Sequence, residues 1–409
     1  MAVNLMSMED SHTFLTALYE QATGEQLASA DTAPFTTVAT TLLQQGYDAI
    51  IGAISQVISR TIFSIRPYSA KFKGLEADAE RWGAIVRKIN FVDGGIETDQ
   101  RMTLTDGYSV DMYKVNKPKV IQTNFYGDTD YQKSVTIFRD QLDKAFQSES
   151  QFNSFISGVL QNVSNQIEQI KEAESRGVLI NMITGRAAQE AVPNIESGMM
   201  INVLQAYYDE TGVQLSPSTM FSGTNYPEFV KWLFAFINTL VSRMGNRTQL
   251  YHTANIGPSG SEQVILRHTP PEFLKAYIYK PIMDKIDSQV MSTVFNPEYL
   301  KTIDFEGIDF WQSLEPGEEM NVSAWPTYLL NTGLLASADS ATAVDNVLGV
   351  IFDRDACGIT TESTWMEATP FNAAGGYYNL FWHFRQRTWN DFTENFVVLY
   401  ADTVTVPSP

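Results

Sequence analysis

A long amphipathic segment with an uncharged outer face limits most strongly how this chain can fold. From Gln147 to Ile170 it reads QSESQFNSFISGVLQNVSNQIEQI, with apolar residues every three or four positions. This spacing predicts an α-helix, and Ser148 followed three positions later by Gln151 is typical of a helix start. The opposite face consists mainly of Asn, Gln and Ser, which lose less than charged groups on partial desolvation. The segment predicts a helix that tolerates a second partner on its outer face, although a surface helix of unusual composition fits it equally well.

The charge of the chain is strongly negative and unevenly distributed. Among 409 residues, 47 acidic residues outnumber 28 basic ones, which gives a net charge of −19. Eleven of the basic residues lie between residues 66 and 133, where only ten acidic residues accompany them. Proteins that read nucleic acids need an excess of cations to neutralise phosphates, so the composition disfavours that class. The basic window predicts a segment that reaches an acidic neighbouring copy, and a solvated hairpin is the alternative.

Several segments carry secondary-structure signals. The window 66–133 contains INFVDGG, TLTDGYSVDMYKV and KPKVIQTNFYG, which predict strands, and its Asp-Gly pairs at 93–94 and 106–107 predict turns. The apolar run VLGVIF predicts a buried strand. The segment GGYYNLFWHFRQRTWNDFTENFVVLYAD predicts a long aromatic strand, a turn or short helix at Asn390–Asn395, and a closing strand. Further predicted elements are helices at 178–186, 199–212, 227–245 and 270–291 and a strand at 263–268.

No motif for catalysis or cofactor binding occurs in the sequence. Phosphate loops, dinucleotide fingerprints, the G-x-S-x-G elbow and H-E-x-x-H are all missing. The single cysteine, Cys357, excludes an intramolecular disulfide and is expected to be a buried thiol, while His383 is expected to pack within a strand. Acidic groups such as EPGEE could serve a glycosidase, but EPGEE has the composition of an exposed turn. We therefore expect no enzyme activity, catalytic residue, metal ion, cofactor, secretory leader or membrane span.

Taken in order, these segments resemble the major capsid proteins of tailed bacteriophages, in particular those of short-tailed phages. The resemblance covers nearly the whole chain as an order of elements, and its sharpest pieces are RWGAIVRKI and the C-terminal segment with NDFTENFVV. It implies an α+β Hong Kong 97-like capsid fold. The implied parts are an N-terminal arm (1–65), an extended β-hairpin loop (66–133), a peripheral domain with a long spine helix (134–189), an axial domain (190–352) and C-terminal return strands (353–409).

The resemblance also implies a function and a set of partners. The chain would assemble with itself into hexamers and pentamers of an icosahedral or prolate shell, and its acidic wall would enclose double-stranded phage DNA without sequence-specific binding. Other implied partners are a separate scaffolding protein, a portal protein, and decoration or head-fibre proteins, with no membrane. The location would be the virion, after assembly in the cytoplasm of the bacterial host. The alternatives are an encapsulin-like nanocompartment shell protein and, from another class, a carbohydrate-active or glycan-binding protein.

Contacts between copies are expected on the basic loop and on the long helix, because opposite charges on identical subunits favour their association. Charge reversal at three of these positions together (Arg81, Arg87 and Lys88) is expected to impair assembly and to leave the fold of the monomer largely intact. The expected contact residues are Arg81, Arg87, Lys88, Lys114, Lys117, Lys119, Phe152 and Asn162.

Overall fold

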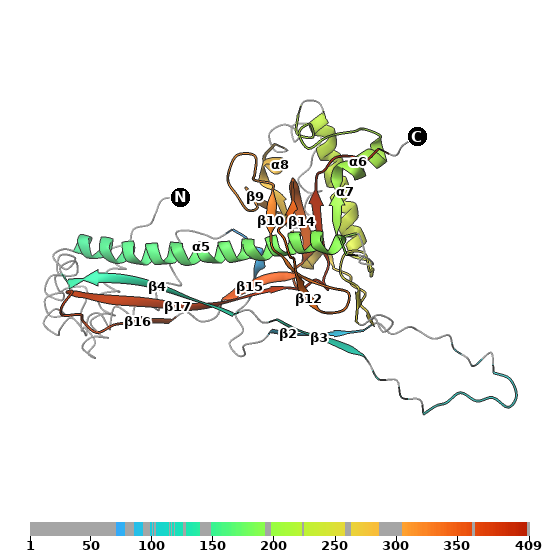
Figure 1. Ribbon diagram of the computed structural model, residues 1–409, viewed down its shortest axis with the longest axis horizontal. Helices are drawn as coiled ribbons and strands as arrows, with labels where there is room; N and C mark the ends of the chain where they lie inside the picture. Colours follow the sequence, from blue (N-terminus) through green and yellow to red (C-terminus); the bar gives the residue numbers. More distant parts are fainter. Residues whose placement is uncertain are drawn as a thin grey trace. The chain divides into compact units, whose positions relative to one another are not determined.

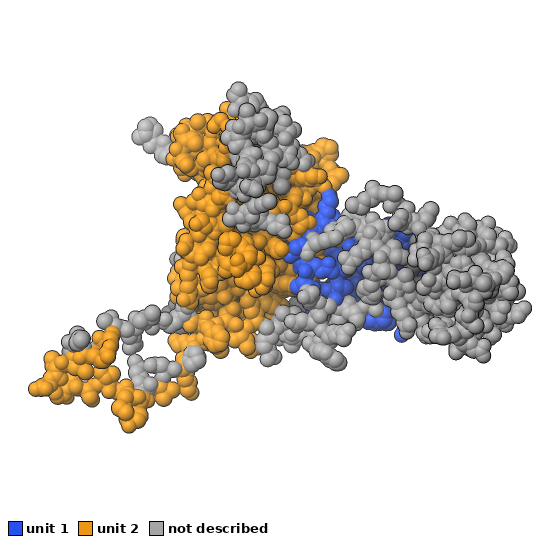
Figure 2. Space-filling model, turned by 180° about the vertical axis from the view of Figure 1, so that it is seen from behind, with its two compact units in different colours: residues 1–82, 127–174, 360–387 blue, residues 83–126, 175–359, 388–409 orange. Residues whose placement is uncertain are grey.

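The computed structural model of the chain describes residues 71–77, 86–92, 99, 101, 104–113, 115, 117, 119–125, 128–139, 149–192, 198–222, 225–257, 263–285, 305–361 and 365–406. The predicted N-terminal arm lies outside these residues. Two compact units make up the chain, and Figure 2 colours them separately. The first unit comprises residues 1–82, 127–174 and 360–387, and the second comprises residues 83–126, 175–359 and 388–409. None of the described helices is both long and apolar enough to cross a membrane.

A five-stranded sheet lies at the centre of the second unit. Its middle strand is β14 (Val347–Asp353), which is buried along its whole length, so the buried strand predicted from VLGVIF is confirmed. Strand β14 pairs in antiparallel fashion with the strands on either side, β18 and β8, and the two outer strands pair in parallel with these. In the order β5-β18-β14-β8-β9, the other strands are β5 (Met200–Asn202), β18 (Phe396–Tyr400), β8 (Leu274–Tyr279) and β9 (Phe305–Ile308).

Helices α6 (Val203–Thr211) and α7 (Asn225–Met244) form one hydrophobic core with residues of this sheet. The prediction of α7 is confirmed, because its apolar residues recur at helical spacing and are buried in that core. Helix α6 begins later than predicted, since Met200–Asn202 pairs with β18 as strand β5. The Asn202 side chain accepts a hydrogen bond from the Leu204 N–H and caps the helix, and Gly212, with φ of 71°, ends it.

The helix predicted at 270–291 is wrong over its first part. Residues Pro271–Phe273 form a short 3₁₀ helix (η4) and Leu274–Tyr279 form strand β8, whereas Lys280–Lys285 are helical, as α8. Residues 286–291 lie outside the described residues. Strand β8 lies between β14 and β9, where its backbone groups are paired on both sides. Tertiary pairing has therefore overridden a local pattern that favours a helix.

The first unit is built on a long strand, β17 (Tyr377–Asn390). Its side chains alternate between buried and half-buried along most of the strand, and Leu380, Trp382 and Phe384 are all buried. It pairs antiparallel with β4 (Asp128–Phe138), side by side in Figure 1, so the predicted long aromatic strand is confirmed. The sheet order is β1-β15-β17-β16, and the remaining strands are β1 (Glu76–Ala77, after the 3₁₀ helix η2, Lys73–Leu75), β15 (Cys357–Thr361) and β16 (Trp365–Ala368).

The predicted long helix is α5 (Glu149–Glu190), which has 42 residues and is therefore about 63 Å long (Figure 1). It includes the helix predicted at 178–186 and continues the apolar stripe, with Val163, Met182 and Ile183 fully buried. Ser148, the predicted cap, lies outside the described residues. The boundary between the two units falls inside α5, as it does inside β15 and β17.

Four short antiparallel pairs complete the described structure, all of them in the second unit. Two of them, β10 with β13 and β11 with β12, together form one long hairpin. Strand β7 covers only the first two residues of the strand predicted at 263–268. The pairs are β2 (Val86–Phe91) with β3 (Val120–Phe125), β6 (Asn255–Ile256) with β7 (Gln263–Val264), β10 (Val322–Ala324) with β13 (Thr342–Val344), and β11 (Thr327–Leu329) with β12 (Leu335–Ser337).

Candidate functional site

Strands β2 and β3 and the segment between them, residues 86–125, form a long loop that we call the tongue. The two strands pair from Val86–Phe125 to Phe91–Val120 and make up its root. Alternate residues of β2 have opposite environments: Asn90 is buried, whereas Ile89 and Phe91 are 55% and 69% exposed. One face of the root therefore lies against its own unit and the other face is open.

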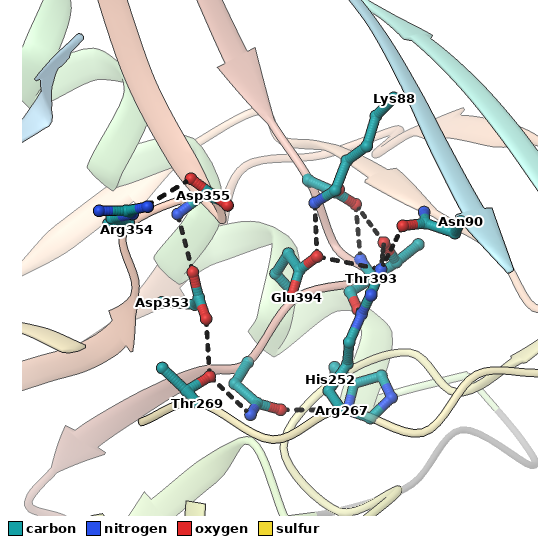
Figure 3. A network of polar contacts seen from close by, with 12 residues as sticks. Lys88, Asn90, His252, Arg267, Thr269, Asp353, Arg354, Asp355, Thr393 and Glu394 are labelled. Carbon is teal, nitrogen blue, oxygen red and sulfur yellow. Dashed lines mark hydrogen bonds and ion pairs between the residues drawn. The ribbon is translucent and has the colours of Figure 1, made fainter. Parts of the chain in front are cut away.

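A buried ion-pair cluster fixes the inner face of the root. The ammonium group of Lys88 lies 2.6 Å from a carboxylate oxygen of Asp391 and 2.5 Å from one of Glu394. Arg267 binds Glu394 as well, at 3.0 Å, and donates a hydrogen bond to the side-chain oxygen of Asn90. Figure 3 shows Lys88 and Asn90 directed from β2 toward this cluster. We call these residues, together with Thr393, the anchor.

The turn that carries the two carboxylates is itself fixed by hydrogen bonds. The N–H and the hydroxyl of Thr393 both donate to Asp391, at 2.9 and 2.6 Å, and Arg267 donates to the carbonyl of Thr393. From the other side the buried Arg186 of α5 donates to the carbonyls of Phe392 and Glu394. The turn predicted between the long aromatic strand and the closing strand thus connects the root of the tongue to α5.

Burial and charge compete at the anchor. Burial opposes ionisation of Asp391, but Lys88 and the hydrogen bonds from Thr393 outweigh it, so the pKa of Asp391 is lowered. Burial also opposes the charged form of Lys88, but the two carboxylates prevail and its pKa is raised. The pKa of Glu394 is raised, because its burial outweighs the attraction of Lys88 and Arg267. Removal of one charge would leave the others uncompensated in a buried site.

A second polar cluster lies beside the anchor. His252 is fully buried, with its ring nitrogens 3.1 Å from the side-chain oxygen of Asn395 and 2.8 Å from the carbonyl of Ile265. Burial, aided by the positive charges of Arg186 and Arg267, lowers the pKa of His252 to about 4. The neutral ring is therefore part of the folded structure near neutral pH.

The tip of the tongue, residues 104–115, has the opposite character. Its described residues are all exposed and include large apolar side chains: Tyr108 is 78% exposed, Met112 is 80% and Tyr113 is 79%. The predicted turn at Asp106-Gly107 is confirmed, with Gly107 at φ of 91°, but the strand predicted from TLTDGYSVDMYKV is wrong, because residues 104–113 form no strand. Clusters of exposed apolar side chains are typical of interaction sites.

The expected contact residues lie in different environments. The ammonium group of Lys88 is bound by carboxylates of its own chain, which gives it an intrachain role, and its contact with another copy stays a prediction. Lys117 and Lys119 are exposed on the tongue, and Asn162 is exposed on α5, where it accepts a hydrogen bond from Gln166. Arg81 and Lys114 lie outside the described residues, and Arg87 and Phe152 are described only by their places in β2 and α5.

Sequence reasoning missed Asp391, Glu394 and Arg267 as anchor residues. The spacing of Asp391 and Thr393 is a local signal for a hydrogen-bonded turn. No local signal joins that turn to Lys88, which precedes Glu394 by 306 positions.

The described residues offer little for metal or nucleophilic chemistry. Cys357 is buried, as predicted, and burial raises the pKa of its thiol well above the usual range. EPGEE forms the predicted exposed turn, closed by a hydrogen bond from the Glu318 N–H to the Glu315 carbonyl. His383 lies on β17, as predicted, and stacks on Trp365. No group of three or more potential ligands that could hold a metal ion occurs among the described residues.

Comparisons with known proteins place the chain in a family. The sequence profile of the Phi29-like phage major capsid protein family matches residues 14–400. Similar solved structures include a chain of "Capsid structure of Staphylococcus phage Andhra", with 11% identity and a TM-score of 0.52, covering 81% of this chain and 84% of that chain. A chain of "Structure of head fiber and inner core protein gp22 of native bacteriophage P68" has 10% identity and a TM-score of 0.51, with the same two coverages of 81% and 84%. No curated protein sequence shows significant similarity.

The structural similarities concern the fold, which has the mixed helices and sheets of phage capsid proteins, so the predicted α+β Hong Kong 97-like fold is confirmed. The family profile covers far more than half of the 409 residues. The chain belongs to the Phi29-like phage major capsid proteins.

Proposed function

We propose that this major capsid protein builds the shell of a phage head as hexamers and pentamers, in an icosahedral or prolate arrangement around double-stranded DNA. The observation that carries the proposal is the contrast within the tongue, whose root is fixed by buried charges while its tip exposes Tyr108, Met112 and Tyr113. A fixed root ties the tongue to its own unit, and an apolar tip gains free energy when a partner covers it.

The partner proposed for the tip is another copy of the same chain. A contact between a projecting loop of one copy and a different surface of the next is heterologous, and such contacts close into rings when the rotation between copies allows it. Hexamers and pentamers are rings of this kind. The other expected contact residues are proposed to lie at these contacts: Arg81, Arg87, Lys114, Lys117, Lys119, Phe152 and Asn162.

The acidic character of the chain supports enclosure of DNA without binding. With a net charge of −19, the protein offers the phosphates little attraction, so packaged DNA could move along the wall. A separate scaffolding protein, a portal protein and head-fibre or decoration proteins are the further partners proposed, with assembly in the host cytoplasm. The family match favours this proposal over a nanocompartment shell and over a glycan-binding protein.

Electron microscopy and sedimentation test the proposal. The full chain is purified alone and together with its candidate scaffolding protein. Shells with hexameric and pentameric rings are the expected result under at least one condition. A chain that stays monomeric at high concentration under both conditions would contradict the proposed function.

A tip variant makes the test specific. Tyr108→Ser, Met112→Ser and Tyr113→Ser together remove the exposed apolar groups, and the matched control carries Thr105→Ala and Ser109→Ala in the same segment. The apolar variant is expected to lose shells while the control keeps them. Equal shell yields from both variants would show that the tip is not the contact.

A further inference from the structure

A long β-hairpin in the second unit carries an exposed apolar surface. We call residues 309–346 the acidic insert, because they contain six carboxylates and neither Lys nor Arg. The insert connects β9 to β14, and β10, β11, β12 and β13 form its hairpin. All of its residues lie in the described part of the chain.

The edge of the hairpin that β11 forms lies on the C-terminal half of α5. The Asn181 amide bridges to the backbone of Thr327, accepting from its N–H at 2.9 Å and donating to its carbonyl at 3.2 Å. Gln189 donates to the carbonyl of Leu329 at 2.6 Å. The Cβ of Tyr328 lies 3.5 Å from the position that a Cβ on Gly185 would occupy. These contacts hold the outer edge of β11 and the Tyr328 side chain against the helix.

The hairpin also carries exposed apolar side chains. Because Tyr328 faces α5 and side chains alternate along a strand, Leu329 and its cross-strand partner Leu335 lie on the side away from the helix. Leu335 is 69% exposed, and Leu334, in the connection that precedes β12, is 68% exposed. Trp325, just before β11, is 69% exposed. An exposed indole and exposed leucine side chains, on an insert that carries six carboxylates and neither Lys nor Arg, form a surface suited to an apolar, cationic ligand.

The returning limb of the tongue, residues 112–125, has the complementary character. It contains Lys114, Lys117 and Lys119 and no carboxylate. Its exposed apolar side chains include Met112, Tyr113, Val115 and Val120. Limb and insert belong to the same unit, yet both remain exposed in the single chain, so the chain does not cover one with the other.

We infer that the exposed face of the acidic insert is the docking surface for the returning limb of the tongue of a second copy of this chain. The inference rests on the proposed function and adds the receiving surface to it. Aromatic and aliphatic side chains would be buried at the centre, and lysines and carboxylates would lie at the rim. The rim charges speed association and make it sensitive to salt.

Photo-crosslinking in assembled shells tests the inference. A photoreactive benzoylphenylalanine replaces Tyr113, and shells are assembled from a mixture of isotopically labelled and unlabelled chains. The expected crosslinks join position 113 of one copy to residues 309–346 of another. Crosslinks to any other segment, or only within one copy, overturn the inference but leave the proposed function standing. If the wild-type chain forms no shells, the proposed function fails and the inference fails with it.

A variant of the insert provides a second measurement that needs no probe. Trp325→Ser with Leu335→Ser removes the apolar face, and Val213→Ser is the control, since Val213 is an exposed apolar residue of the same unit outside the insert. We expect the double variant to keep the unfolding midpoint of the control and to lose shell yield by at least about tenfold. A shell yield equal to that of the control overturns the inference.

Discussion

Lys88 at the root of the tongue and Tyr113 at its tip lie in opposite environments, although both belong to one loop. The charge of Lys88 is neutralised by Asp391 and Glu394 of its own chain, whereas the Tyr113 side chain is 79% exposed. The root therefore contributes to the stability of the single chain, and the tip offers apolar surface that only a partner can cover. A basic residue in a capsid loop is thus not by itself evidence of a contact between subunits.

The largest effect is expected from charge reversal at the root, so for Lys88 the expectation from the sequence that charge reversal leaves the monomer's fold intact is revised. Lys88→Glu would place a third carboxylate beside Asp391 and Glu394, and loss of one partner from a buried ion pair already costs about 3–5 kcal/mol. Chemical denaturation of the monomer should show a loss of at least this size. The control Lys117→Glu, at an exposed position of the same tongue, should stay within about 0.5 kcal/mol of wild type. Equal effects of the two changes would remove the distinction between root and tip.

Acid should weaken the region beside the root. The pKa of His252 is about 4 in the folded chain and 6.5 ordinarily, so the unfolded chain takes up its proton first as the pH falls. The stability contributed by the neutral ring is present above pH 6.5 and is lost toward pH 4, by about 3 kcal/mol. Denaturation at several pH values should show a shallower pH dependence for His252→Gln than for wild type. The same slope for both would mean that His252 is not buried as a neutral ring.

Two glycines of α5 differ in the space around them: Gly185 lies in close contact with the turn of the anchor, and Gly177 lies at an open position. A Cβ on Gly185 would lie 2.7 Å from the ring of Phe392 in the turn of the anchor, so Gly185→Ala should cost about 1–3 kcal/mol. A Cβ on Gly177 would meet nothing within 4 Å, so Gly177→Ala should stabilise the helix by about 0.5–1 kcal/mol. Thermal melts of the two variants should move in opposite directions. Shifts of the same sign would contradict the close packing of α5 on the anchor.

The smallest effect on the monomer is expected at the tip. Because the side chains of Tyr108, Met112 and Tyr113 are mostly exposed, their replacement by Ser should change the free energy of unfolding by less than about 0.5 kcal/mol per residue. Urea denaturation of the non-assembled chain measures this. A loss of several kcal/mol would show that the tip packs on its own chain in solution.

The sequence predicted those elements whose signal is local. The predictions of β14 from its apolar run, of α7 from its amphipathic pattern and of β17 from its aromatic residues were all correct. Each of these signals depends only on residues close together in the sequence. Strand β8 was missed, since its pairing with β14 and β9 depends on segments distant in the sequence. The role of Lys88 was missed for the same reason, as its carboxylate partners lie about 300 positions away. The exposed face of the acidic insert could not be predicted, because burial of one side depends on α5.

Hydrogen exchange of the tongue, compared between the non-assembled chain and the shell, tests the central claim most directly. We expect fast exchange at residues 104–113 in the non-assembled chain and slow exchange in the shell, with β14 protected in both. Slow exchange of the tip before assembly, or fast exchange that persists in the shell, would contradict the claim that a second copy covers the tip.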